Sequence, residues 1–181
     1  MATVKRGREC GDAPGHHHIR RLKGEPAELK ELQGVLEEAP TCSTRITGAP
    51  TGPDGAASVF AALPQGKAHG DKFLFGIYCG DQLIGCADVI RGYPNPTTAI
   101  LGLLLISEKH QRQGVGRRAY AMIGQLIRDW GTCDTIRGGV IRTNAEVIPF
   151  WESLGFEPTG EVAPYHYGPV RSENVILRRR L

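Results

Sequence analysis

The most informative segment of this chain runs Ser107-Glu108-Lys109-His110-Gln111-Arg112-Gln113-Gly114-Val115-Gly116-Arg117-Arg118. An apolar run over residues 100–106 precedes it and predicts a buried strand. Apolar residues at helical spacing follow it and predict an amphipathic helix that reaches about Trp130. The segment therefore joins a strand to a helix. Its glycines, Gly114 and Gly116, let the backbone pass close to a ligand with N–H groups pointing outward.

The charges of the segment are a second signal. A helix N-terminus carries partial positive charge and favours Asp or Glu. Here Lys109, Arg112, Arg117 and Arg118 gather against a single nearby acid, Glu108. The glycines alone could be ordinary turn residues, and the arginines alone could be solvated side chains of a first helical turn. The agreement of both features favours a phosphate-binding turn.

The composition indicates one globular domain. The chain has 181 residues, of which 40% are hydrophobic and 23% charged, and this is enough for a proper core. We expect residues 1–15 to form a disordered tail and residues 16–181 to form the domain. The net charge of +3 is too small to indicate a nucleic-acid partner. No apolar run approaches the roughly eighteen residues of a membrane span, and the N-terminus lacks the apolar core of a secretory signal. We therefore expect a cytoplasmic protein with no nucleic-acid or membrane partner.

Metal and disulfide chemistry find little support in the sequence. The five cysteines are Cys10, Cys42, Cys79, Cys86 and Cys133. They are dispersed and form no C-x-x-C pair, which argues against a disulfide framework and against a zinc ribbon. The run His16-His17-His18 has no Cys or acidic partner at ligand spacing. We predict no metal, and we interpret the histidines as the end of a tail that leads into a first strand.

The periodicity of the chain predicts an α/β domain. Strands are expected over residues 17–22, 73–79, 82–90, 100–106, 135–141 and 174–179, with a further strand at Phe156. Helices are expected from Pro26 to before Pro40, over residues 56–63, after the glycine turn, and from a cap at Asn144 to Gly155. Pro149 should delay or bend the last of these helices. Residues 41–55 are expected to be a long loop, and Gly80-Asp81 a tight hairpin turn. The predicted order, β-α-α-β-β-β-α-β-α-β-β, indicates a mixed central sheet flanked by helices.

Two motifs resemble those of the GNAT superfamily of N-acetyltransferases. Residues 111–116, Q-R-Q-G-V-G, match the family's Q/R-x-x-G-x-G/A motif. Asn144 followed by Phe150-Trp151-Glu152-Ser153-Leu154-Gly155-Phe156 resembles its second signature, an Asn followed by an aromatic pair and Gly-Phe. The motifs cover about residues 101–156, and the upstream hairpin extends the match to about Phe73. The resemblance implies the GNAT fold, a single domain with a mostly antiparallel sheet.

The resemblance also implies acetyl-CoA as co-substrate and an amine as acceptor. In such enzymes the pyrophosphate lies on the turn amides, pantetheine runs beside the preceding strand, and the Asn side chain holds the pantetheine amide. Trp151 would pack against the cofactor or the core. Salt links to the CoA phosphates would come from Lys109, Arg112, Arg117 or Arg118. The implied cofactor-binding residues are Leu104, Leu105, Ile106, Gln111, Arg112, Gln113, Gly114, Val115, Gly116, Arg117, Asn144 and Trp151.

The implied reaction is direct acetyl transfer. A primary amine loses its proton and attacks the thioester, and backbone N–H groups near Leu105 or Ile106 stabilise the tetrahedral oxyanion. The family often uses a Tyr to protonate the leaving thiolate, but Trp151 occupies that position here, and indole is no useful acid. Tyr165 and Tyr167, with His166 between them, are expected in a loop before the last strand and are candidate proton donors. Each could instead only shape the pocket, and CoA thiolate can also leave without a protein acid.

Asp88 lies in an otherwise apolar strand, residues 84–90. An acid in such a strand costs free energy unless it has a partner. Asp88 therefore either binds or deprotonates a cationic substrate, or is a structural carboxylate paired with Arg91 or Arg142. Cys86 shares its strand face by alternation, but no neighbouring base suggests a covalent role.

Other interpretations compete with this one. Residues 114–119 fit the G-x-G-x-x-A pattern of a dinucleotide-binding fold, but Gly114 does not follow the strand directly and Asp134 precedes the next strand. A non-catalytic acyl-CoA-binding sensor remains open because of Trp151. The acceptor also remains open among small amines, amino acids, antibiotics, and protein N-termini or lysines. A homodimer is possible because sheet-edge dimers are common in the family.

Overall fold

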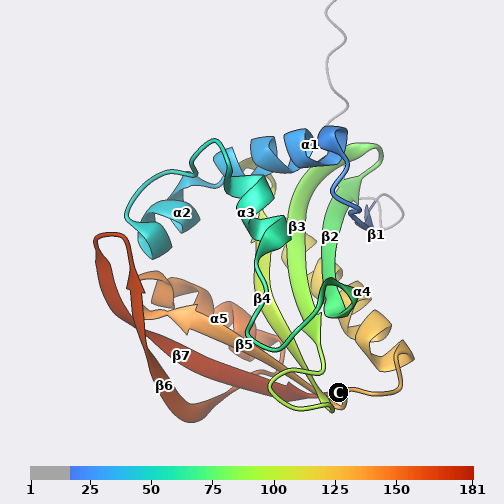
Figure 1. Cartoon of the computed structure of the whole chain (residues 1–181), viewed down its shortest axis with the longest axis vertical. Helices are drawn as coiled ribbons and strands as arrows, with labels where there is room; N and C mark the ends of the chain where they lie inside the picture. The colour runs from blue at the N-terminus through green and yellow to red at the C-terminus, as the bar shows by residue number, and fades with distance from the viewer. Residues whose placement is uncertain (1–16) are drawn as a thin grey trace, which may run out of the picture.

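The computed structural model describes residues 17–181. Its centre is a seven-stranded sheet in the order β1-β2-β3-β4-β5-β7-β6 (Figure 1). All neighbouring strands are antiparallel except β4 and β5, which are parallel. The strands are β1 (His17–Arg21), β2 (Lys72–Cys79), β3 (Gln82–Arg91), β4 (Thr98–Ile106), β5 (Thr135–Ile141), β6 (Glu157–Tyr167) and β7 (Val170–Arg180). The predicted single domain with a mixed, mostly antiparallel sheet is confirmed.

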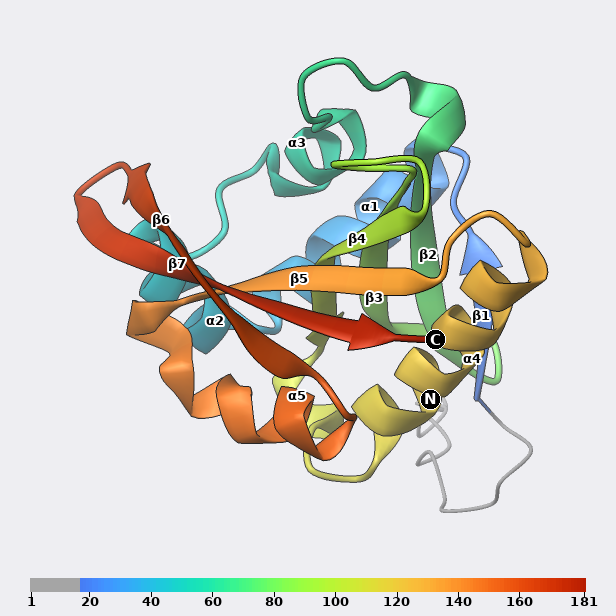
Figure 2. The same ribbon diagram turned by 90° about the horizontal axis from the view of Figure 1, so that it is seen from below.

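Helices cover both faces of this sheet (Figure 2). The α-helices are α1 (Pro26–Glu37), α2 (Pro40–Thr47), α3 (Gly55–Ala61), α4 (Val115–Asp129) and α5 (Ile148–Ser153). Short 3₁₀ segments are η1 (His69–Asp71), η2 (Glu108–His110) and η3 (Arg142–Val147). On one face, Leu32 of α1 joins a buried cluster with Leu74 of β2. On the other face, Ile127 of α4 is fully buried with Val89 and Ile136. Each such side chain contributes about 1.5–3 kcal/mol through burial.

The sheet opens between β4 and β5. Their parallel pairing runs only from Thr98↔Thr135 to Ile100↔Arg137. Directly afterwards β4 carries a bulge, because Val89 pairs with Leu101 while Asp88 pairs with Leu103. A bulge bends the strand and increases its twist. The later half of β4 therefore turns away from β5, and this opening positions the site.

Most predicted elements are confirmed. The hairpin turn at Gly80-Asp81 is present, with Cys79 paired to Gln82, and α4 and β5 lie where the periodicity places them. Pro149 delays the last helix as expected, since α5 begins at Ile148 with this proline in its first turn. The predicted tail, residues 1–15, and His16 lie outside the described residues.

Three expectations about local structure are wrong. Residues 41–55 are not one loop, because α2 begins with Pro40 and ends at Gly48, which has a left-handed conformation (φ 83°). Tyr165, His166 and Tyr167 are not in a loop but end strand β6, where Tyr165 pairs with Ser172 of β7. The prolines of β6 obscured this strand, and they are tolerated because β6 is an edge strand. Asn144 is not a helix cap but lies inside η3 with non-helical φ and ψ of −118° and 27°.

The cysteines follow the expectation except at one position. Within residues 17–181, Cys42, Cys86 and Cys133 are free thiols, whereas Cys79 is disulfide-bonded. Burial raises the pKa of the Cys86 thiol to about 12, which leaves it inert at neutral pH. No helix in this part of the chain combines the length and the apolar character that crossing a bilayer requires.

Candidate functional site

The open edge of β4 offers free backbone groups. The N–H of Ser107 donates to the carbonyl of Ile84 on β3 at 2.9 Å. Because antiparallel pairs alternate, Leu103 and Leu105 direct their N–H and C=O groups toward β3, whereas Leu104 and Ile106 direct theirs into the opening. Of the two amides expected for an oxyanion, only that of Ile106 therefore faces the opening.

The turn after β4 is shaped by two left-handed residues. Arg112 has φ 60° and Gly114 has φ 75°. Gly114 is the N-cap of α4 and makes no side-chain cap, and the N–H of Arg118 donates to its carbonyl at 3.1 Å. The amides of the first helical turn, residues 115–117, therefore have no partner within the helix. Such a set of N–H groups at the positive end of a helix suits a phosphate.

Side chains fix this turn to β4. Gln111 Nε2 donates to the Ile106 carbonyl at 2.8 Å. Ser107 is fully buried, and its Oγ lies 2.7 Å from Nδ1 of His110. Sequence reasoning missed this Ser–His contact, although a Ser directly after a strand with a His three residues later was a visible signal. Burial lowers the pKa of His110, so the ring favours its neutral form.

The four predicted cations surround the turn but differ in their contacts. Lys109 Nζ pairs with Glu38 Oε1 at 2.6 Å, and Arg117 donates to the Oγ of Ser153 at 2.9 Å. Arg118 lies beside the turn, 3.6 Å from the place of a Cβ on Gly114. Arg112 makes no salt bridge within residues 17–181 and is exposed. Arg112 and Arg118 are therefore the cations best placed for an anion.

A pocket of about 250 Å³ lies on the α3 side of β3 and β4. Asp88 is its only charged lining residue. The bulge residue Gly102 also lines it, and a Cβ there would stand 3.8 Å from Asp88 Oδ2. The remaining lining residues are Ala62, Leu63, Pro64, Ile90, Tyr93 and Ile100. The bulge that opens the sheet thus borders the carboxylate.

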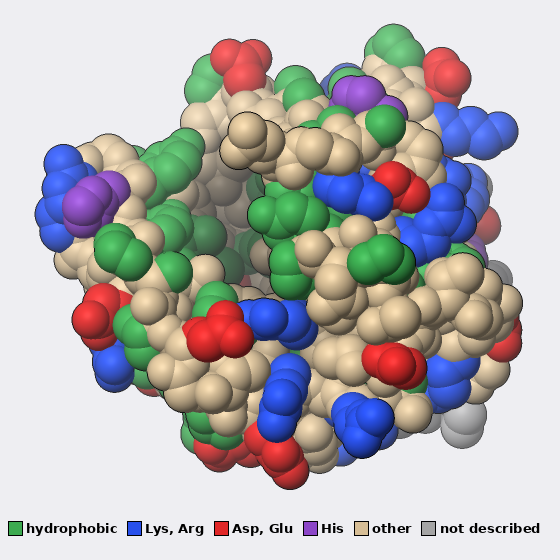
Figure 3. Space-filling view, turned by 60° about the horizontal axis from the view of Figure 1, so that its bottom comes forward, with side chains coloured by type: hydrophobic (Ala, Val, Ile, Leu, Met, Phe, Trp, Pro, Cys, Tyr) green, Lys and Arg blue, Asp and Glu red, His purple; other side chains and the backbone are tan. Residues whose placement is uncertain are grey.

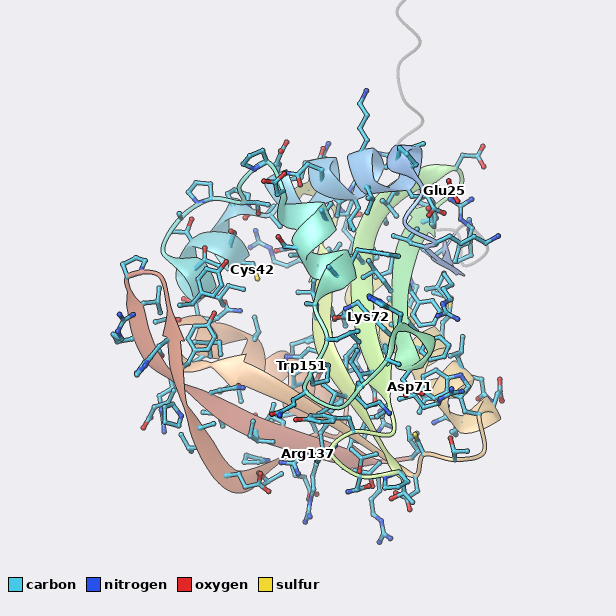
Figure 4. The ribbon with its side chains drawn as sticks, viewed as in Figure 1. Glu25, Cys42, Asp71, Lys72, Arg137 and Trp151 are labelled. Atoms are coloured by element: carbon cyan, nitrogen blue, oxygen red, sulfur yellow. The ribbon has the colours of Figure 1, made fainter. Side chains whose placement is uncertain are left out.

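Asp88 has one occupied and one unoccupied oxygen. Lys72 Nζ donates to Asp88 Oδ2 and to the carbonyl of Ala62, both at 2.8 Å. The Lys72 side chain, labelled in Figure 4, is 4% exposed and that of Asp88 is 14% exposed, so the pair is shielded from water. Oδ1 of Asp88 is buried and has no partner within the described chain. Burial raises the pKa of Asp88, and the hydrogen bond from Lys72 opposes this rise.

The expected partners of Asp88 were wrong. Arg91 binds Asp71 at 3.2 Å instead, and Arg142 pairs with Glu173. Sequence reasoning missed Lys72, although a lysine at the start of an apolar strand is as costly to bury as Asp88 and also requires a partner.

The second motif lies beyond the opening. Asn144 Oδ1 accepts a hydrogen bond of 3.3 Å from Arg45 of α2, which leaves its amide nitrogen for another acceptor. The Trp151 ring packs edge-on against Phe150 and Phe156, with ring centroids 5.2 Å apart in both pairs. Trp151 thus takes part in the core on the α4 side, and its expected contact with the cofactor stays a prediction.

The candidate tyrosines have different surroundings. Tyr165 donates its hydroxyl proton to the Ile46 carbonyl of α2 at 2.8 Å, and burial raises its pKa. Tyr167 is 57% exposed at the end of β6. The structure does not bring either of them into the pocket of Asp88. Tyr165 instead ties α2 to the β6–β7 hairpin, beside which the surface is hollowed (Figure 3).

Asn174 of β7 is a further polar group on this side of the sheet. Its Oδ1 is buried without a partner in the described chain, and it lies against Gly139, where a Cβ would come within 2.3 Å. By alternation Asn174 shares its face with Tyr165, which contacts α2. The Gly138-Gly139 pair inside a strand was the signal for this close approach. No group of three or more His, Cys, Asp or Glu in residues 17–181 is placed to hold a metal ion.

Comparison with known proteins identifies the domain type. The sequence model of the acetyltransferase (GNAT) family matches residues 37–156. A search of curated proteins found no match.

Solved structures share the fold at low sequence identity. An acetyltransferase from Thermus thermophilus is 20% identical, with a TM-score of 0.70 over 92% of this chain and 97% of its own. The ribosomal-protein-S18-alanine N-acetyltransferase of Escherichia coli is 19% identical, with a TM-score of 0.64 over 91% and 93%. A spermidine N-acetyltransferase from Vibrio cholerae, solved with CoA and spermine, is 15% identical, with a TM-score of 0.70 over 91% and 95%. At these identities the likeness concerns the fold alone.

Replacing Lys72 by Met should destabilise the protein in a pH-dependent manner. The change leaves ionised Asp88 buried without its cation, which costs about 3 kcal/mol. Because the folded-state pKa of Asp88 is raised by burial, this cost is absent below the unfolded-state pKa, where the carboxyl is protonated in both states. It grows as pH rises from there to the folded-state pKa and is complete above it. Urea unfolding should therefore show a larger deficit at neutral than at mildly acidic pH.

Lys30→Met, on the exposed face of α1, is the matched control and should change stability little at either pH. A Lys72→Met deficit that is equal at both pH values would contradict the role given to the pair.

Proposed function

The chain belongs to the acetyltransferase (GNAT) family, and on this premise we propose that it transfers the acetyl group of acetyl-CoA to a primary amine. One observation carries the proposal. The unpaired edge of β4 leads into the turn whose free amides begin α4. The buried carboxylate of Asp88 lies at the other end of that edge, beside the bulge.

The donor would lie along this edge. Free amides of residues 115–117 would bind the pyrophosphate, with Arg112 and Arg118 adding charge. The N–H of Ile106, which faces the opening close to the turn, would pair with an amide carbonyl of pantetheine. Asn144 would add its free amide nitrogen. The residues present therefore fit the phosphate and amide groups of CoA.

The acceptor would react at Asp88. Its carboxylate, which lines the pocket, would accept a proton from the amine, whose nitrogen then attacks the thioester carbon. As the C–N bond forms and the C–S bond breaks, the N–H of Leu104, which is the opening-facing amide nearer to Asp88 than that of Ile106, is available for the oxyanion. Tyr165 is engaged with Ile46 and Tyr167 is exposed, so we assign neither as acid, and CoA leaves as a thiolate that water protonates.

The first experiment is thiol release from acetyl-CoA with a panel of amino acids, polyamines, aminoglycosides, simple alkylamines and short peptides. Release above the amine-free background supports acetyl transfer, and the best amine identifies the acceptor class. Acetyl-CoA binding without release on any amine would refute the proposed activity. It would favour the acyl-CoA sensor, which Trp151 at the usual tyrosine position also suggests.

Gly114→Ala should weaken acetyl-CoA binding about tenfold. Alanine resists the left-handed conformation of this position, at a cost of roughly 1–2 kcal/mol, so the turn amides would be redirected. The added Cβ would meet only Arg118 at ordinary contact distance. Isothermal titration with acetyl-CoA measures the change.

Gly131→Ala, at the other end of α4, is the matched control. Gly131 has a similar φ of 65° and nothing within 4 Å of its Cβ position, so its strain is comparable but distant from the turn. Equal affinities of the two variants would refute the phosphate site.

Asp88→Asn should lower kcat/KM for the amine about 100-fold and leave acetyl-CoA affinity unchanged, because the amide keeps the size of the carboxyl but takes no proton. Asp71→Asn is the control, since Asp71 also pairs with a lysine, Lys67, at 2.7 Å but does not line the pocket. An unchanged kcat/KM in Asp88→Asn would remove this residue from the mechanism.

A further inference from the structure

We propose that the acceptor is a small monoamine with an apolar body, bound in the pocket beside Asp88. This inference rests on the proposed function and adds the class of its substrate. Two properties of the pocket carry it, namely an apolar lining and a capacity for a single cationic group.

The lining is apolar apart from one carboxylate. Leu63 and Pro64 follow α3, Ile90 ends β3, Tyr93 lies in the next turn and Ile100 lies on β4. None of these side chains offers a charge, and with the other lining residues they border an open pocket of about 250 Å³. An alkyl or aryl group of the acceptor would replace water there. Each additional CH₂ that is buried should strengthen the interaction about fourfold.

The pocket has room for one ammonium group. Asp88 is the one carboxylate that lines the pocket, and Lys72 already holds its Oδ2. Its Oδ1 has no partner in the described chain but is buried, so an ammonium group reaches it only when the carboxylate turns toward the pocket. Asp71, which precedes Lys72 in the chain and lies outside the pocket, is held by Lys67 at 2.7 Å and by Arg91 at 3.2 Å. Lys67 and Arg91 also flank the turn that carries Tyr93, with Lys67 Nζ 3.3 Å from the carbonyl of Gly92.

The surrounding charge therefore disfavours a polycation. Three cations, Lys67, Lys72 and Arg91, stand against two acids, Asp71 and Asp88. A second ammonium on the acceptor would meet no free carboxylate and would be repelled by these cations. A polyamine or aminoglycoside fits this wall poorly, whereas a monoamine brings one charge to the one free oxygen.

Three amines test the inference by thiol release from acetyl-CoA. Pentylamine and cadaverine share one five-carbon chain and differ by the second ammonium group, and ethylamine lacks three of the methylenes. We expect kcat/KM for pentylamine to exceed that for cadaverine by more than tenfold and that for ethylamine by more than tenfold.

A pair of variants ties the preference to this pocket. Leu63→Asp places a second acid in the wall and should raise the ratio of kcat/KM for cadaverine to that for pentylamine at least tenfold. Leu63→Asn introduces a side chain of nearly the same size as Asp but without its charge. This variant should therefore leave the ratio close to that of the unmodified protein. Leu63 lies in a half-buried linker rather than in the core, and thermal unfolding of both variants verifies that they are folded.

The outcomes separate the two proposals. If cadaverine equals or exceeds pentylamine in the unmodified protein, or if only peptides or aminoglycosides are acetylated, acetyl transfer stands and the inference of an apolar monoamine is wrong. If Leu63→Asp and Leu63→Asn change the ratio equally, the pocket does not select the acceptor. If acetyl-CoA binds and no amine releases thiol, the proposed function fails and the inference fails with it.

Discussion

The separation of β4 from β5 after Ile100 is the constraint on which the rest of the site depends. Backbone N–H and C=O groups left unpaired inside a sheet cost free energy unless they find another partner. The bulge at Gly102 creates this situation by turning β4 away from its neighbour. It leaves Leu104 and Ile106 facing the gap and brings the pocket of Asp88 to its edge. One irregular residue thus produces both the bare strand edge and the access to the carboxylate.

A sheet divided in this way needs a connection across the gap, and α2 supplies it. On the β4 side, the N–H of Thr41 donates to Glu108 at 2.9 Å. On the other side, Arg45 pairs with Glu146 at 2.7 Å and Ile46 accepts the hydroxyl of Tyr165. The short helix therefore fixes the spacing of the two walls (Figure 1). These contacts are largely polar and exposed. The α2 segment is therefore the part of the cleft that can move most easily when a ligand binds.

The sequence predicted what depends on local periodicity and failed where partners are distant. Apolar runs located β2 and β3, which are buried on both faces, and helical spacing located α4, which buries one face. The turn from Gln111 to Gly116 was also visible, since its glycines and charges are neighbours in the chain. By contrast, α2 is held by contacts to η3 and β6 rather than by its own apolar face. The pairing of Lys72 with Asp88 joins two strands through a register that no local pattern encodes.

This pair links the chemistry of the site to its selectivity. Burial alone would favour a neutral Asp88, and a neutral carboxyl can neither attract an ammonium nor take its proton. Lys72 keeps the anionic form accessible, but by binding Oδ2 it also neutralises most of the charge that a second ammonium would need. A site with more acidic residues would bind polycations. A carboxyl without a cationic partner would stay protonated in such a pocket. In the proposed mechanism, the compromise between these limits would be a base that serves one amine at a time, with the apolar walls supplying the rest of the binding.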